Sequence, residues 1–160
     1  MSEANYDAII ALLDAAAVPY KIHEHEAIRT VDDAKEKLPH LAPIMVKTIA
    51  FALKDGRIVL AAIHGQDRID YRKVAQAVGT NRRNVRSMSP EEVLTELGYE
   101  VGSVGPFALQ DNVLILIDKH VAQMPTLNCG SGKTTVTLEL SFVSLHQVTG
   151  GQVLSLAKIN

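Results

Sequence analysis

The spacing of apolar and polar positions predicts alternating helices and strands. Apolar residues recur at helical spacing over residues 6–17, and residues 20–25 alternate between polar and apolar as a half-buried strand does. Two longer apolar runs, residues 44–53 and 57–63, flank the pair Asp55-Gly56, which favours an antiparallel hairpin. Further apolar or alternating segments predict strands at residues 113–117, 135–140 and 152–157, and a short helix at 141–148.

Capping residues predict three more helices. The expected N-caps are Thr30, Asp70 and Ser89, and the matching ends lie near residue 38, at Gly79 and at Gly98. Asp33 completes a capping pair with Thr30. Strands and helices are therefore mixed, and the hairpin favours antiparallel or mixed pairing. We expect an α+β, or mixed α/β, fold: one compact domain over residues 1–160 with a mostly antiparallel mixed sheet surrounded by helices.

Lys47 is the unusual residue in this pattern, because it interrupts the apolar run 44–53. Side chains alternate between the two faces of a strand, and both faces of this run are otherwise apolar. A lysine is almost never fully buried without a partner. Either its stem packs while the ammonium group reaches water, or the ammonium group has a function in a partly desolvated place.

Composition and charge are those of an ordinary globular protein. The 160 residues are 47% hydrophobic and 21% charged, with a formal net charge of -2, which argues against a protein that coats nucleic acid by charge alone. The one cysteine, Cys129, excludes a disulfide framework and a multi-cysteine zinc site. The sequence has no signal-peptide pattern and no apolar run of membrane-spanning length, so we expect a cytoplasmic protein without a membrane partner.

Two glycine-rich segments are candidate binding loops. Residues 98–107 place three glycines and a proline between a helix and a strand, where bare N–H groups can approach an anion. Taken by itself, the pattern favours a tight connection from helix to strand over a binding loop. Residues 129–135 include Gly132-Lys133-Thr134, yet Leu127 stands where a P-loop needs its first glycine. We therefore interpret the second segment as a turn between strands, with Cys129 as a packing residue.

Basic and histidine residues give weaker signals. Arg82, Arg83 and Arg86 follow a predicted helix and superficially resemble a helix-turn-helix, but the space for a second helix is only about two turns. They remain candidates for phosphate contacts or for a solvated basic edge. His23 and His25 share a strand face without an evident third ligand, so we expect no metal site there.

Several segments together resemble the YbaK/ProX family, free-standing relatives of the editing domain of bacterial prolyl-tRNA synthetases. The matching segments are residues 20–25, Val46-Lys47-Thr48, 69–79, 98–107, Ile117-Asp118, Gly130-Ser131-Gly132-Lys133 and 137–140. Their order and spacing carry the resemblance, which covers most of the chain. It implies a compact mixed-sheet domain that hydrolyses the ester of mischarged aminoacyl-tRNA without a cofactor.

The resemblance also implies where the site residues lie. The expected catalytic residues are Lys47 and the loop residues Gly102, Ser103, Val104, Gly105 and Pro106. The expected substrate-binding residues are Tyr20, His23, Thr48, Gly130, Ser131 and Gly132, and the expected tRNA contacts are Arg82, Arg83 and Arg86. Ala108 stands where the family commonly has glycine, which affects the shape of the loop.

Three functional hypotheses remain open at the level of sequence. The first is a deacylase that acts in trans on aminoacyl-tRNA, with an aminoacyl-tRNA synthetase as a possible partner. The second is a catalytically silent module of the same fold that binds tRNA or another nucleic acid. A DNA-binding regulator rests only on the arginine segment, and the net charge of -2 argues against it.

Overall fold

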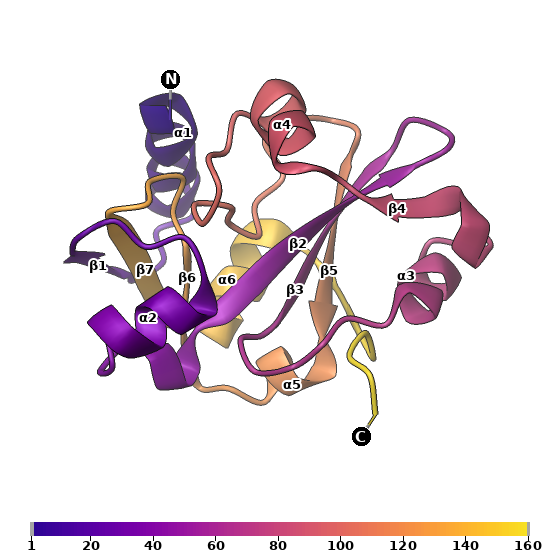
Figure 1. Cartoon of the computed structure of the whole chain (residues 1–160). Helices are drawn as coiled ribbons and strands as arrows, with labels where there is room; N and C mark the ends of the chain where they lie inside the picture. Colours follow the sequence, from indigo (N-terminus) through magenta and orange to yellow (C-terminus); the bar gives the residue numbers. More distant parts are fainter. Residues whose placement is uncertain (1, 160) are drawn as a thin grey trace.

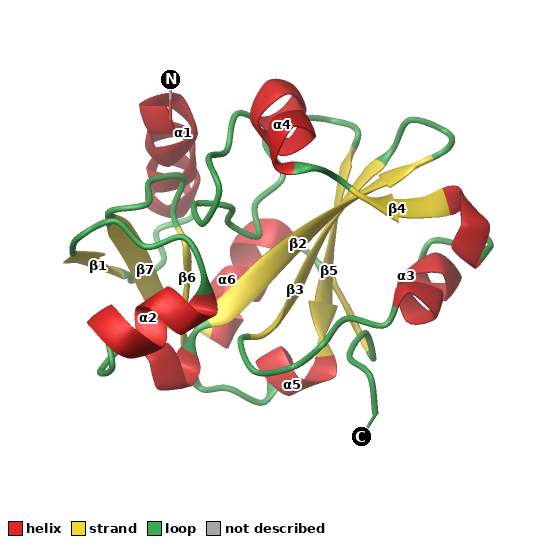
Figure 2. Cartoon of the chain, in the orientation of Figure 1, coloured by secondary structure: helices red, strands yellow, loops and turns green. Residues whose placement is uncertain are grey.

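Two β-sheets form the framework of the computed structural model, which describes residues 2–159 (Figures 1 and 2). The five-stranded sheet has the order β4 (Val85–Ser87), β2 (Val46–Leu53), β3 (Ile58–His64), β5 (Val113–Asp118), β8 (Gln152–Leu154). The three-stranded sheet has the order β1 (Lys21–Glu24), β7 (Val136–Ser141), β6 (Thr126–Gly130). A bridge between Met45 and Asn128 joins the start of β2 to β6.

Helices surround these sheets, so the mixed α+β class expected from the sequence is confirmed. The α-helices are α1 (Ser2–Ala15), α2 (Val31–Lys37), α3 (Tyr71–Ala77), α4 (Pro90–Glu92), α5 (Lys119–Ala122) and α6 (Phe142–Thr149). Two 3-10 turns (Ala42–Ile44 and Arg82–Asn84) and a π-helical turn (Val93–Leu97) complete the elements. None of the helices at residues 2–159 is both long and apolar enough to cross a membrane.

The expected hairpin and helix caps are present. β2 and β3 pair antiparallel with Ala52 opposite Ile58, whereas β5 pairs parallel with both β3 and β8, so the large sheet is mixed. Thr30 accepts a hydrogen bond from the backbone N–H of Asp33, and Ser89 forms a capping box with Glu92. Both helices therefore begin at the capping residues that the sequence predicted.

Apolar side chains pack on both faces of β2 and β3. On one face Val46, Ala50 and Leu60 join a core that includes Ile9 and Leu13 of α1. On the other face the core cluster contains Phe51, Leu53, Val59 and Ile63 with Val74 of α3. A strand covered on both sides is what the two apolar faces of residues 44–53 indicated.

The arginine segment is not the second helix of a helix-turn-helix. Arg82–Asn84 forms only a 3-10 turn, and the chain then enters β4, which pairs antiparallel with the end of β2. β-Pairing to an existing sheet edge satisfies the backbone of Val85–Ser87 more completely than an isolated short helix would.

The last strand is shorter than predicted. β8 ends at Leu154 rather than at residue 157, because the backbone N–H groups of Leu156 and Ala157 donate to the carboxylate of Asp118, at 2.7 and 3.0 Å. A buried side chain thus replaces a neighbouring strand as the acceptor.

Candidate functional site

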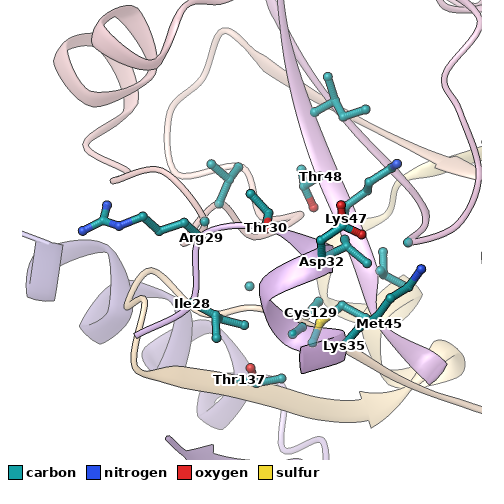
Figure 3. Close-up of a pocket in the computed structure, with 18 of the residues that line it drawn as sticks. Ile28, Arg29, Thr30, Asp32, Lys35, Met45, Lys47, Thr48, Cys129 and Thr137 are labelled. Atoms are coloured by element: carbon teal, nitrogen blue, oxygen red, sulfur yellow. The ribbon is translucent and has the colours of Figure 1, made fainter. Parts of the chain in front are cut away.

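A cavity of about 470 Å³ opens where the start of β2 meets α2 and the β6–β7 hairpin. Its wall is built from five segments that are far apart in sequence: residues 28–35, 45–49, 65–68, 102–104 and 129–137. Figure 3 shows part of this lining, with Lys47 and Thr48 of β2 near Asp32 and Thr30. The cavity lies where the two sheets meet, so each segment is held by a regular element or by a glycine contact.

Lys47 lies in this wall, on the second residue of β2, and is partly buried. Burial lowers the pKa of its ammonium group below the ordinary lysine value, because desolvation disfavours the charged form. Asp67 opposes this effect, Arg68 adds to it, and Asp32 opposes it more weakly. The structure therefore places Lys47 in a partly desolvated wall among charged side chains.

Four threonines line the cavity, Thr30, Thr48, Thr134 and Thr137, and their hydroxyl groups differ in their hydrogen-bond partners. Thr30 caps α2, and the hydroxyl of Thr137 is hydrogen-bonded to Nε2 of His25 at 2.8 Å. The Oγ1 atom of Thr48 is buried without a hydrogen-bond partner at residues 2–159. Leaving a buried polar atom unpaired costs about 1–3 kcal/mol, so a ligand that pairs with Thr48 regains that energy.

The cavity wall is positively charged although the chain as a whole is not. Its cationic side chains are Arg29, Lys35, Lys47, Arg68 and Lys133, and its carboxylates are Asp32 and Asp67. A chain with a formal net charge of -2 therefore gathers a local excess of positive charge at one concave place. A concave basic surface focuses the potential on an anionic ligand.

Glycines let three backbone segments meet at the cavity. Gly102 has φ +87°, and a Cβ atom there would meet Cα of Arg29 and lie 2.7 Å from the carbonyl oxygen of Ile28. A Cβ atom on Gly105 would lie 2.5 Å from the carbonyl oxygen of Gly130. Gly130 itself packs on the carbonyl group of Val104. The loop of residues 102–106 is therefore fixed by backbone-to-backbone contact, which larger residues would prevent.

Two backbone donors in this loop are available. Gly102 and Val104 both line the cavity, and within the described part of the chain neither N–H donates to a backbone carbonyl group. Ser103, between them, is different, because its N–H and its hydroxyl both bond the carbonyl oxygen of Glu100, at 3.0 and 2.8 Å. The hydroxyl of Ser103 is thus occupied within the loop, whereas the N–H groups of Gly102 and Val104 have no backbone acceptor among residues 2–159.

The structure brings together five of the residues expected at the site. Lys47, Thr48, Gly102, Val104 and Gly130 line one cavity. The neighbouring residues Ser103, Gly105, Pro106, Ser131 and Gly132 support the loop and the hairpin from outside the lining. Ser131, for example, is fully buried and donates to the carbonyl oxygen of Val136 at 2.6 Å.

Tyr20 and His23 lie outside the cavity. The hydroxyl of Tyr20 is 2.8 Å from the carboxylate of Asp14, which raises the pKa of the phenol. Nε2 of His23 is 2.8 Å from Oε1 of Glu139 on the neighbouring strand β7. Both side chains thus have partners within their own part of the fold.

The three arginines lie at the opposite end of β2 from Lys47. β4, which contains Arg86, pairs with residues 51–53 of β2. Arg86 forms two hydrogen bonds of 2.7 Å with the carboxylate of Glu92, which lowers the pKa of that carboxyl group to about 2. The guanidinium group of Arg82 stacks 4.2 Å above the Tyr71 ring. Arg83 is exposed.

Sequence patterns gave no signal for the other charged residues of the wall. Arg29, Asp32, Lys35, Asp67 and Arg68 look like ordinary surface residues, and only the fold brings them to Lys47. Asp32 and Asp67 could have been suspected only from the need of a partly buried lysine for a countercharge.

Cys129 also borders the cavity and is completely buried. Burial raises the pKa of its thiol to about 12, so the thiol is protonated at neutral pH. A protonated thiol is a poor nucleophile, which agrees with its interpretation as a packing residue.

Comparison with known proteins points to one kind of domain. Residues 25–148 match the family model of the aminoacyl-tRNA editing domain. The chain is 30% identical over 124 residues to the uncharacterized protein YwhH of Bacillus subtilis, covering 74% of this chain and 77% of YwhH. It is 26% identical over 139 residues to a proline–tRNA ligase of Lactiplantibacillus plantarum, covering 81% of this chain but only 24% of the ligase.

Solved structures show the same fold. The hypothetical protein APE2540 superposes with a TM-score of 0.84 at 24% identity, covering 94% of this chain and 99% of that one. A proposed trans-editing enzyme for prolyl-tRNA synthetase superposes with a TM-score of 0.81 at 23% identity, covering 97% and 98%. At this level of identity the likeness concerns the fold.

Proposed function

Because the chain belongs to the aminoacyl-tRNA editing domain family, we propose that it acts in trans on mischarged aminoacyl-tRNA and hydrolyses the ester bond at the tRNA 3′ end. Residues 1–160 would form one deacylase domain. The chain spans about a quarter of the proline–tRNA ligase it matches, so the proposed activity corresponds to an editing step and not to amino-acid activation. A cytoplasmic site of action and a synthetase as partner belong to the same proposal.

The basic cavity with a desolvated lysine in its wall is the observation that supports this proposal best. The 3′ end of an aminoacyl-tRNA carries phosphates, a terminal adenosine and an ester that adjoins the free α-amino group. Positive charge attracts the phosphates, and partial burial strengthens every electrostatic interaction with the ester.

Lys47 would hold the reacting end of the substrate. Its ammonium group is a compact cation on a flexible stem, suited to the ester oxygen or the terminal phosphate. Asp67 and Asp32 favour the charged form of Lys47, while burial and Arg68 disfavour it. Lys47 is thus a positively charged group whose hydration has already been partly removed.

The loop of residues 102–106 would stabilise the oxyanion. Attack on the carbonyl carbon moves an electron pair to the carbonyl oxygen, and the N–H groups of Gly102 and Val104 are the available donors. Water attacks the carbonyl carbon, either directly or after the neighbouring ribose hydroxyl has taken over the acyl group. The bond to the ribose oxygen then breaks, this oxygen takes the proton that the attacking water gives up, and the free amino acid leaves.

Thr48 and Gly130 would complete the enclosure. The Oγ1 atom of Thr48 is buried and has no partner among residues 2–159, and it would pair with a polar group of the aminoacyl end or the ribose after the side chain rotates toward the cavity. Gly130 borders the cavity and packs directly on the carbonyl group of Val104, so closely packed backbone would form the wall that encloses the terminal adenosine. Tyr20 and His23, which lie outside the cavity, receive no part in this proposal.

A deacylation screen tests the proposal. The full chain is incubated with a panel of mischarged tRNAs, and release of the amino acid is followed against the spontaneous rate. We expect at least one mischarged tRNA to be hydrolysed well above that rate, while correctly charged tRNAs are spared. Binding of tRNA without hydrolysis of any panel member would replace the proposal with a catalytically silent binding module.

A further inference from the structure

A second group of polar side chains lies beside the cavity, at the lower end of the five-stranded sheet. His64 is the last residue of β3, Asp67 follows in the next turn, and His120 belongs to the first turn of α5, which packs against β3 (Figure 1). One potential ligand atom from each residue lies within 4.8 Å of the other two. No sequence pattern indicates this group, because His120 is far from the other two residues in the chain.

The two histidines and the aspartate already contact one another. Nδ1 of His120 lies 2.8 Å from Oδ2 of Asp67, and the two imidazole rings are stacked with centroids 4.5 Å apart. The side chains of His120 and Asp67 remain 47% and 30% exposed, so a solvated ion has access and the side chains have room to adjust.

His64 is oriented as a metal-binding histidine usually is. Its Nδ1 atom accepts from the backbone N–H of Gln66 at 3.1 Å, and its Nε2 atom lies 3.3 Å from the carbonyl oxygen of Pro43. The neutral tautomer with the proton on Nε2 satisfies both contacts, and its Nδ1 lone pair, which now accepts from Gln66, is the one that a metal ion would take. A ligating histidine typically donates its other N–H to a backbone carbonyl group in this way.

Hydrogen bonds fix the backbone of the turn that contains His120. The carboxylate of Asp118 caps α5 by accepting from the backbone N–H of His120 at 3.0 Å. The other oxygen of the same carboxylate accepts from Leu156 and Ala157. The backbone position of His120 is therefore fixed, and only its ring must rotate to bring a nitrogen atom to a shared ion.

We propose that His64, Asp67 and His120 bind one divalent first-row transition metal ion, with Zn²⁺ as the reference ion. Two imidazoles and one carboxylate, with remaining positions open to water, form a donor set that such ions prefer. Zn–N and Zn–O bonds of about 2 Å put the ligand atoms of a tetrahedral site roughly 3.3 Å apart. The more distant atoms of the group, which lie up to 4.8 Å apart, must therefore move closer, while His120 and Asp67, at 2.8 Å, must separate slightly. On binding, the Gln66 N–H contact at His64 and the proton shared by His120 and Asp67 are given up.

The site borders the cavity through Asp67, which is part of both. A bound metal ion would therefore neutralise a carboxylate that now favours the charged form of Lys47. Metal binding itself does not depend on the proposed hydrolysis, and it can be measured without tRNA.

Calorimetry with untagged, chelator-treated full chain and ZnCl₂ tests this proposal. We expect one ion per chain, and a dissociation constant that rises roughly tenfold or more in Asp67→Asn and in His120→Gln. The matched control is His23→Gln on β1. It removes one histidine of the pair His23 and His25 and should leave the binding of Zn²⁺ unchanged. Circular dichroism confirms that the variants are folded.

Cobalt spectroscopy supplies a second readout on the same variants. Co²⁺ in a nitrogen–oxygen site gives visible absorption bands that should be present in the unmodified chain and in His23→Gln, and absent in His120→Gln. The proposal is wrong if the chain binds no Zn²⁺, if binding is equal in all variants, or if His23→Gln alone removes it.

Discussion

At the scale of one residue, the fold gives Lys47 an unusual environment for an ammonium group. Its ammonium group is desolvated by the cavity wall, and the carboxylates of Asp67 and Asp32 only partly compensate. The apolar run around it could be recognised from the sequence, because a lysine among apolar residues on both faces of a strand is uncommon. Its countercharges could not be recognised, since they come from α2 and from the turn after β3.

The lowered pKa of Lys47 predicts a measurable titration. In the native protein the ε-ammonium group should lose its proton at a lower pH than in the unfolded chain, because burial disfavours the charge only in the folded state. Heteronuclear NMR of the lysine ε-positions, with Lys47→Arg used to assign the signal, checks this. Asp67→Asn should lower the pKa further, since it removes a charge that opposes the shift; a rise would contradict the described electrostatics.

Other residue predictions depended on packing that no pattern shows. Thr48 was expected at the site, yet its buried, unpaired hydroxyl could be seen only in three dimensions. Ser103 was expected at the site as part of a loop that acts through its backbone N–H groups, and its hydroxyl is bonded to the carbonyl oxygen of Glu100 within the loop. The glycine-rich loop could be recognised from the sequence, whereas the partner of the Ser103 hydroxyl depends on the folded backbone.

At the scale of elements, substitution of Gly102 in the loop of residues 102–106 should affect both the stability of the protein and its deacylation rate. Gly102→Ala introduces a Cβ atom at φ +87° and drives it into the backbone of Arg29 and Ile28, so both stability and rate should fall. Gly56→Ala is the matched control, because Gly56 also has a positive φ, +94°, but nothing lies within 4 Å of its Cβ position. Gly56→Ala should lower the free energy of unfolding by about 1–2 kcal/mol and leave the deacylation rate unchanged.

Denaturant unfolding and single-turnover deacylation measure these two effects. Gly102→Ala should lose more free energy of unfolding than Gly56→Ala and roughly a hundredfold or more in rate, the usual cost of misplacing an oxyanion donor. Ser103→Ala removes one hydrogen bond and should lower the free energy of unfolding by about 0.5–1.5 kcal/mol, while most of the deacylation rate is retained. If Ser103→Ala is the inactive variant and Gly102→Ala is active, the backbone-donor mechanism is wrong.

Elements with strong local signals were predicted, and those that depend on pairing were not. The hairpin β2–β3 and the capped helices follow from turn and capping residues within a few positions. β6 contains Asn128, Cys129 and Gly130, which have little strand preference, and it is a strand because it pairs with β7. β4 is likewise created by the edge of β2.

At the scale of the whole molecule, charge is divided between two places on a chain with a net charge of -2. The cavity wall carries Arg29, Lys35 and Arg68, while Arg82, Arg83 and Arg86 lie at the other end of β2. We expect the first group to hold the 3′ end of a tRNA and the second to contact its body. The sequence showed the second group as a cluster, but gave no sign of the first.

Two variants separate these contributions. Arg68→Ala should weaken binding of both a full tRNA and a short acceptor-stem hairpin, whereas Arg83→Ala should weaken only the full tRNA. Each lost phosphate contact should lower the slope of log affinity against log salt by about 1. Titrations at several salt concentrations check this, and equal effects of Arg83→Ala on both RNAs would contradict the assignment.

The most direct test of the central claim compares Lys47→Ala with Lys54→Ala in single-turnover deacylation of the preferred mischarged tRNA. Lys54 is exposed and lies outside the cavity wall, so its variant controls for the loss of one positive charge. We predict that both variants keep the native circular dichroism spectrum, and that Lys47→Ala loses roughly a hundredfold or more in rate while Lys54→Ala stays near the unmodified rate. Near-normal hydrolysis by folded Lys47→Ala would contradict the account.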